Sequence, residues 1–157
     1  MSFSPSTIAN YFLERARSEG QPLTPMQVIK LVYIAHGWHW GYFNHALINE
    51  PVEAWKFGPV IPSLYQDLKC YGSGVVQNSL RSPLGEEEAL VRSSDTLALL
   101  DHVWRRYNRF NGLQLSTLTH EPNTPWARSY RPNLWGSEVI PEQLIADHYR
   151  HKIQTGQ

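Results

Sequence analysis

Seven histidines are the residues in this sequence that most readily suggest chemistry. His36 and His39 are three residues apart, a spacing that two metal ligands on one helix can use. His120, which is followed by Glu121, is a candidate for acid–base chemistry. A metal site also needs further ligands and hydrogen bonds that orient the imidazoles, and the chain has no HExxH motif. We therefore favour histidines that pack and cap helix ends, with a metal-dependent enzyme as an alternative.

The single cysteine, Cys70, excludes an internal disulfide and a multi-thiolate metal site. A nucleophilic pair of Cys70 with a histidine is conceivable, but no oxyanion-hole loop accompanies it. We expect a buried or half-buried structural thiol. The GxGxxG, P-loop and GxSxG motifs are also absent. These observations predict a protein that is not an enzyme and binds no cofactor.

The charge balance argues against nucleic acid as the partner. The 14 basic residues equal the 14 acidic ones, whereas a nucleic-acid binder usually carries a basic excess. Arg105 and Arg109 share a helix face, which we interpret as solvated. The chain starts without a signal-peptide pattern and has no apolar run of about 18 residues. We expect a cytoplasmic protein that does not contact a membrane.

Helical periodicity, interrupted by proline and glycine, predicts one mainly α-helical domain over residues 1–157, a bundle of about six helices. The second helix is apolar nearly all round, as expected at the centre of a bundle, and Gly37 and Gly41 would let another backbone approach it. The predicted helices run from Pro5 to about Gly20, Pro25 to about Gly41, Pro62 to about Gly72, Ser94 to Phe110, Leu113 to Thr119, and Pro141 to about Lys152.

Three segments lie outside this helical pattern. Residues 47–55 read as two short extended pieces around a turn, and Pro51 limits any hairpin after the second helix to a small one. Residues 73–93 are rich in Gly, Ser and Pro and predict a long connection that is either mobile or functional. Residues 153–157 are expected to fray.

Aromatic residues are the remaining candidates for function. Six Trp and eight Tyr are many for this length, and such residues anchor both cores and protein interfaces. Most belong to the core by default. Trp55, Lys56 and Phe57 differ because they lie in an extended turn region, where we expect partial exposure.

Several segments together resemble the Panacea domain, a family that includes SocA-like and phage-associated GepA proteins. They are LTPMQVIKLVYIAHGWHW, EPVEAWKFGPVIPSLYQDLKCYG, LLDHVWRRYNRFNGLQLSTLTHEPNTPWARSY and VIPEQLIADHYRHKI. The resemblance covers roughly residues 5–153. It implies a mainly helical fold with a small β element. It also implies an antitoxin that binds and neutralises a cognate protein toxin, in many cases a translation inhibitor. A protease adaptor that delivers its toxin for degradation is an alternative.

The resemblance also suggests roles for individual residues. We predict that partner contact involves Lys30, Trp55, Lys56, Phe57 and Tyr65. The remaining matches to the family are predicted to be structural, and they are Tyr33, Gly58, Pro59, His120, Pro125 and Trp126.

Overall fold

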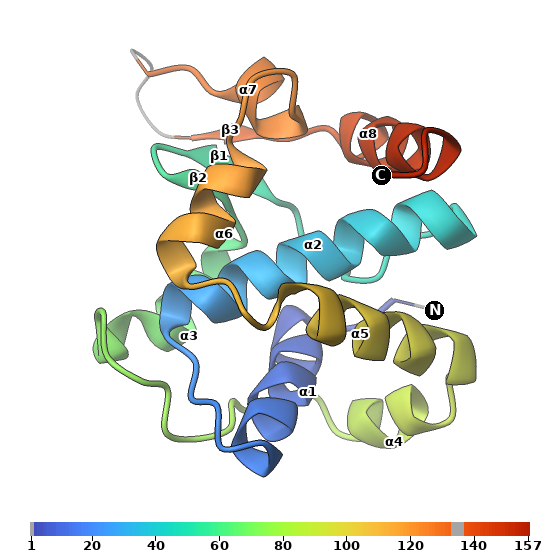
Figure 1. Cartoon of the computed structure of the whole chain (residues 1–157). Helices are drawn as coiled ribbons and strands as arrows, with labels where there is room; N and C mark the ends of the chain where they lie inside the picture. The colour runs from blue at the N-terminus through green and yellow to red at the C-terminus, as the bar shows by residue number, and fades with distance from the viewer. Residues whose placement is uncertain (1, 133–136) are drawn as a thin grey trace.

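The structure is a computed structural model that describes residues 2–132 and 137–157. It confirms the predicted mainly α-helical fold (Figure 1). The described α-helices are α1 (Pro5–Ser18), α2 (Pro25–Phe43), α3 (Pro62–Leu68), α4 (Glu86–Val91), α5 (Ser94–Tyr107), α6 (Gly112–Thr119), α7 (Pro125–Ser129) and α8 (Glu142–Gln154). A 3₁₀ helix, η1 (Lys69–Tyr71), follows α3. The two short helices α4 and α7 are additions to the six predicted helices, and the predicted third helix divides into α3 and η1.

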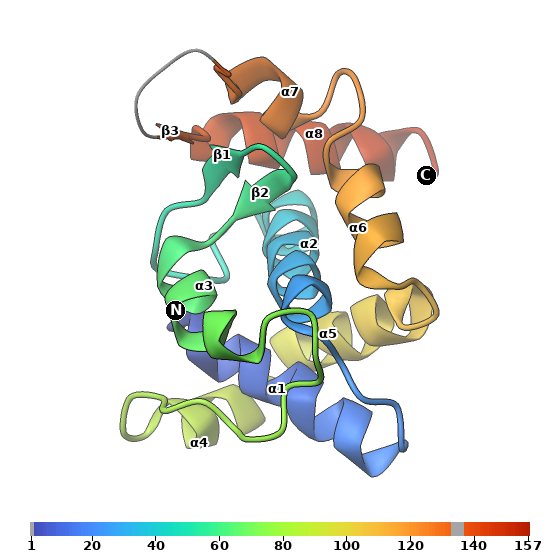
Figure 2. The ribbon, with the colours of Figure 1, turned by 90° about the vertical axis from the view of Figure 1, so that its left-hand side faces the viewer.

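Helix α2 is the central element, as its apolar sequence predicts. Thr24 and Gln27 form a capping box at its start, and Asn44 ends it in the left-handed conformation with φ 53°. It packs against α1, α3, α5, α6 and α8 and against strand β2 (Gly58–Val60). Figure 2 looks nearly along α2 and shows these elements arranged around it.

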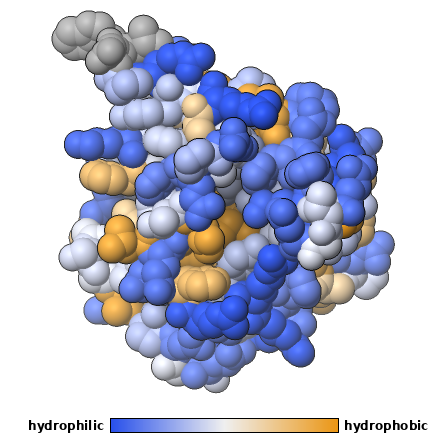
Figure 3. Space-filling model, turned by 45° about the horizontal axis from the view of Figure 1, so that its top comes forward, coloured by the Kyte–Doolittle hydropathy of each residue, from blue (hydrophilic) through white to orange (hydrophobic). Residues whose placement is uncertain are grey.

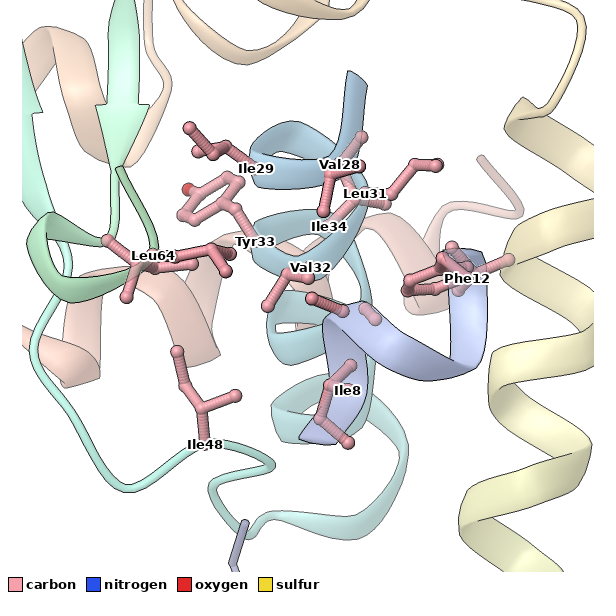
Figure 4. Close-up of a cluster of buried hydrophobic side chains, with 14 of the residues drawn as sticks. Ile8, Phe12, Val28, Ile29, Leu31, Val32, Tyr33, Ile34, Ile48 and Leu64 are labelled. Carbon is pink, nitrogen blue, oxygen red and sulfur yellow. The ribbon is translucent and has the colours of Figure 1, made fainter. Parts of the chain in front are cut away.

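Aliphatic and aromatic side chains from all sides of α2 form one hydrophobic core. Figure 4 shows Val28, Leu31, Val32 and Ile34 of α2 among side chains from α1, α3 and the segment after α2. Ile8, Phe12 and Leu64 are among these neighbours, and each is at most 1% exposed. Because residues 28–39 of α2 are covered on every side, Lys30, His36 and His39 are buried along with their apolar neighbours.

The α2–α8 contact depends on two glycines. A Cβ atom on Gly37 would lie 2.1 Å from Cε2 of Tyr149, inside the ring's van der Waals surface. A Cβ on Gly41 would lie 3.1 Å from the backbone carbonyl carbon of Tyr149. The close approach expected at these two positions is therefore made by α8, through a ring at Gly37 and through backbone at Gly41.

The predicted small hairpin after the second helix is confirmed, but its position within the chain is different. Strands β1 (Glu53–Trp55) and β2 pair with Trp55 opposite Gly58, so the chain turns at residues 56–57 and not at Pro51. Gly58 has φ +116°, a conformation that L side chains rarely adopt, which explains why the turn forms beside it. Strand β3 (Glu138–Val139) pairs with the other edge of β1, giving the order β2-β1-β3.

Residues 73–93 do not form a long free connection. They contain α4, and the side chain of Asn10 bonds both backbone groups of Leu80, at 2.7 and 2.8 Å. Glu86 accepts hydrogen bonds from the Ser4 amide and the Thr7 hydroxyl. This segment is therefore held against α1 by polar contacts that span about 80 residues of sequence.

The fraying expected for residues 153–157 stays a prediction; in the structure α8 continues to Gln154, and the amides of Thr155 and Gln157 bond the carbonyls of its last turn. The expected burial of Cys70 was wrong, because Cys70 lies exposed in η1, a turn in which no residue is buried. No helix in the described ranges is long and apolar enough to cross a membrane.

Candidate partner-binding site

The residues predicted to contact a partner come together in one cleft of about 310 Å³. The first turns of α2, the β1–β2 hairpin and the α3–η1 segment surround it, on the side of the molecule that faces the reader in Figure 2. We call it the hairpin cleft, and its lining residues are Pro25, Met26, Ile29, Lys30, Trp55, Lys56, Phe57, Val60, Tyr65, Lys69 and Gly72. The five predicted residues are separated by up to 35 positions in the sequence, so only the fold could bring them together.

Aromatic side chains form the rim of the hairpin cleft. Phe57, at the tip of the hairpin, is 61% exposed, and the Lys56 ammonium lies 5.5 Å from the centre of its ring. Trp55 packs edge-to-face on Tyr65 with ring centres 4.9 Å apart, and its indole N–H donates to Glu53. In Figure 3, hydrophobic side chains gather on the left half, the side on which Figure 1 places the hairpin, and the right half is largely hydrophilic.

A buried lysine forms the base of the hairpin cleft. Lys30 is 2% exposed, and its ammonium donates to the Pro59 carbonyl at 2.6 Å. Burial lowers the pKa of Lys30 to about 7. An ammonium has three hydrogens, and this carbonyl is the acceptor that the described residues offer it. Lys30 can therefore donate further hydrogen bonds to a group that enters the cleft.

Gly58 and Pro59 lie where the hairpin packs against Lys30. A Cβ on Gly58 would lie 3.1 Å from the Lys30 Nζ and 3.3 Å from the Thr119 Oγ1. The turn is also tied to α6, because the Ser116 hydroxyl donates to the Phe57 carbonyl. The hairpin tip is thus fixed at its backbone while its side chains remain exposed.

Three more of the predicted structural residues support the hairpin from its far side. The indole N–H of Trp126 donates to the Trp55 carbonyl at 2.5 Å, and its ring contacts that of His120 with centres 5.3 Å apart. Pro125 begins α7, which presents Trp126 to the hairpin, and His120 ends α6. A stacked contact with Tyr130 completes this support.

The histidines considered as metal ligands lie in separate environments. The His36 Nε2–H donates to Glu142 at 2.7 Å, and its Nδ1 faces the amides of Leu47 and Ile48. His39 bonds the His45 carbonyl and the Thr96 hydroxyl. Within residues 2–132 and 137–157, no group of three or more His, Cys, Asp or Glu could hold a metal ion. The imidazoles of His36 and His39 instead join α2 to its neighbours.

Glu142, whose side chain is 40% exposed, affects the buried Tyr33 through its charge. Burial raises the pKa of the Glu142 carboxyl, but hydrogen bonds from His36 and Trp40 outweigh this effect and lower it overall. Tyr33 is fully buried, and burial together with the Glu142 charge raises its pKa. The arrangement stabilises a charged carboxylate against α2, and Tyr33 fills the space beside it, as a structural residue would.

A second cleft, of about 230 Å³, was not foreseen from the sequence. We call it the cationic cleft, and its charged lining residues are Arg106, Arg109, Lys152 and Glu121. The sequence placed Arg105 and Arg109 on one helix face, but Arg105 pairs with Asp101 at 3.0 Å and Arg106 lines the cleft instead. The sequence shows that Arg106 and Arg109 are three residues apart. It does not show that α8 places Lys152 in the same cleft.

Comparisons with known proteins identify the family of this chain. Residues 28–127 match the family model described as "Antitoxin SocA-like, Panacea domain". Antitoxin SocA of Caulobacter vibrioides (strain NA1000 / CB15N) is 27% identical over 157 residues, which cover 95% of this chain and 84% of that protein. No solved structure matches. The family segment contains the five predicted contact residues and covers more than half of the chain, so this chain belongs to the SocA-like Panacea-domain antitoxin family.

Proposed function

We propose that this protein is an antitoxin that neutralises a cognate protein toxin by direct binding, and that the hairpin cleft receives a segment of the toxin. The observation that carries the proposal is the convergence of Lys30, Trp55, Lys56, Phe57 and Tyr65 on one cleft. An exposed aromatic on a rigid turn loses little conformational entropy on binding, which makes Phe57 a suitable anchor.

The lining of the hairpin cleft suggests the chemistry of the toxin segment. Lys30, Lys56 and Lys69 line it, and no Asp or Glu is among the lining residues that the structure describes. The remaining walls are mostly apolar, so the matching segment combines apolar side chains with a carboxylate. A carboxylate that reaches Lys30 would form a charge-assisted hydrogen bond out of water, where such bonds are strong.

The cleft alone is smaller than a stable protein interface. Such interfaces bury on the order of 1,200–2,000 Å² in total, with a few anchors at the centre and a polar rim. The exposed side chains of Met26 and Tyr65 extend the apolar surface around Phe57. We propose that the toxin inserts one segment into the hairpin cleft and covers the surrounding surface.

The decisive experiment is coexpression of this chain with the protein encoded beside it. We expect rescue of growth and a purified complex. Phe57→Ala should weaken that complex about 30-fold, because a central aromatic anchor contributes about 2 kcal/mol. Phe43→Ala is the matched control, since Phe43 is an exposed phenylalanine at the far end of α2 that does not line the cleft.

Two outcomes would contradict the proposal. Failure of the neighbouring protein to bind would count against the antitoxin function itself. Equal losses in Phe57→Ala and Phe43→Ala would remove the hairpin cleft as the contact site. Toxin half-life in the same cells separates the two mechanisms, because direct neutralisation leaves it unchanged or longer, and a shorter half-life would assign delivery to a protease.

A further inference from the structure

The cationic cleft lies against the same central helix as the hairpin cleft but has a different chemical character. Arg106 and Arg109 reach it from α5 and its C-terminal end, and Lys152 reaches it from α8. Aromatic residues that include Tyr107 and Tyr149 form much of the remaining wall. The cleft therefore combines cations with flat apolar surfaces.

The three cations form no ion pair with an Asp or Glu side chain within the described parts of the chain. Arg106 lies over Trp38 and Tyr107, at 5.1 and 5.3 Å, and also donates to the backbone oxygen of Gln157 at 3.2 Å. Arg109 and Lys152 lie over Phe110 and Tyr149, at 5.2 and 5.9 Å. No ion pair joins any of the three to Asp or Glu in residues 2–132 or 137–157.

The net charge of the lining is positive in a chain whose overall charge is zero. Glu121 is the one carboxylate among the described lining residues, so three cations and one anion leave two positive charges. His148 also lines the cleft, but burial and nearby cations lower its pKa to about 4, which leaves it neutral at pH 7. A dianion would match this charge.

A tyrosine hydroxyl adds a neutral donor to these cations. Tyr149 is 5% exposed and lines the cleft, and its hydroxyl makes no hydrogen bond to the described residues. Burial raises its pKa, so the group remains protonated and able to donate. Its ring is held in place against Gly37, which makes the position of the hydroxyl well defined.

We propose that the cationic cleft binds the phosphoryl group of a small phosphorylated molecule. A phosphate monoester carries about −1.5 to −2 charges at pH 7, which matches the charge left by the lining residues. Guanidinium groups donate paired hydrogen bonds to phosphate oxygens, and Arg106 and Arg109 provide two of them. The aromatic walls can pack against the organic part of such a ligand.

The test is calorimetric titration of the purified full chain at low ionic strength. The probes are inorganic phosphate, a nucleoside 5′-monophosphate and the parent nucleoside. We expect phosphate and the monophosphate to compete for a single site with a stoichiometry of one. The nucleoside should not bind. A monophosphate that binds more tightly than phosphate assigns an organic phosphate as the ligand, and equal affinities assign free phosphate.

Variants of the lining residues locate the binding. Arg109→Gln combined with Lys152→Gln should weaken phosphate binding at least about tenfold, which corresponds to about 1.4 kcal/mol. Tyr149→Phe removes one hydroxyl that has no protein partner and should weaken it about threefold. Arg105→Gln is the matched control, because Arg105 lies on the same helix but pairs with Asp101 at 3.0 Å outside the cleft.

Two results would overturn the proposal. The first is the absence of saturable phosphate binding at low ionic strength in a chain whose melting temperature shows it to be folded. The second is an equal loss of affinity in Arg105→Gln and in the double variant, which would indicate a general charge effect. Neither result depends on the toxin, so this test stands apart from that of the antitoxin function.

Discussion

The hairpin cleft and the cationic cleft both include residues of the central helix α2 but differ in the chemistry of their walls. The hairpin cleft presents apolar walls and a buried ammonium that bonds one carbonyl. The cationic cleft presents three cations that pair with no Asp or Glu side chain among the described residues. One helix can serve both because α2 is covered on all sides, so each face takes its character from the elements packed against it.

The two clefts should also respond differently to solution conditions. The charge on Lys30 can change near neutral pH because burial lowers its pKa to about 7. Arginines keep their charge at every accessible pH, and their mutual repulsion is weakened by salt. Stability should therefore depend on pH through the hairpin cleft and on ionic strength through the cationic cleft.

The largest expected effect is a loss of stability at the α2–α8 contact, which should impair the cationic cleft and spare the hairpin cleft. Gly37→Ala places a methyl group 2.1 Å from the buried Tyr149 ring, which must move. We expect a loss of about 3 kcal/mol in the free energy of unfolding, measured in urea. Phosphate binding should weaken with it, because Tyr149 lines the cationic cleft, while toxin affinity of the folded fraction should be retained.

Adding Tyr149→Leu to Gly37→Ala should recover part of the lost stability, since the smaller side chain leaves room for the methyl group. An unchanged urea midpoint in Gly37→Ala would show that α8 does not pack on α2 as described.

The second prediction concerns the pH dependence due to Lys30. Its pKa is about 7 in the folded chain and near 10.5 in the unfolded chain, so the unfolded chain binds more protons between these values. Stability due to Lys30 therefore rises with pH. The wild type should gain about 2 kcal/mol relative to Lys30→Met between about pH 7 and pH 9.

Urea unfolding at several pH values measures this difference. Lys56→Met is the control, because Lys56 is exposed at the hairpin tip, and its profile should parallel that of the wild type. Parallel profiles for the wild type and Lys30→Met would contradict the burial of a titrating ammonium.

The third prediction tests whether Trp126, which bonds the Trp55 carbonyl from behind the hairpin, contributes to toxin binding. Trp126→Phe removes the hydrogen bond to the Trp55 carbonyl and should cost about 1 kcal/mol of stability. Toxin affinity should fall severalfold as well, because the hairpin loses an anchor. Trp40→Phe removes a comparable bond to Glu142 and should lower stability while leaving toxin affinity unchanged. Equal losses of toxin affinity in both variants would argue against a specific link between Trp126 and the cleft.

The smallest expected effect tests the repulsion within the cationic cleft. Arg109→Gln should raise stability by about 0.5 kcal/mol at an ionic strength of about 0.01 M, because it removes one of three neighbouring cations. Thermal unfolding should show this gain disappearing at about 1 M salt. Arg105→Gln should give no gain, since Arg105 is paired with Asp101. A gain that persists at high salt would have another cause.

The elements of this fold could be predicted where their signals are local. Pro25 marked the start of α2 correctly, and the structure adds a capping box made by Thr24 and Gln27. The hairpin was placed too early, within residues 47–55, whereas Gly58, which carries the required positive φ, lies after that segment. Residues 73–93 look like a free loop because Asn10, which pairs with Leu80, is 70 residues away.

The candidate site could be predicted in part. Aromatics in a turn indicated exposure at Phe57, which the structure shows. The burial of Lys30 could not be foreseen from its neighbours, because the hairpin that covers it comes almost 30 residues later. Adjacent arginines on α5 differ by about 100° around the helix axis, so sequence alone did not distinguish the exposed Arg105 from Arg106 in the cleft.

The amino-acid sequence by itself determined the helical class of this protein, its apolar central helix and its family resemblance. Caps, periodicity and turn residues act over a few positions and can be read directly. Only the tertiary structure decided which lysine is buried, which arginines line the cationic cleft and which histidines hydrogen-bond to distant segments. Burial and electrostatic energies are sums over segments that lie far apart in the chain, and these sums exist only once the segments have packed around α2.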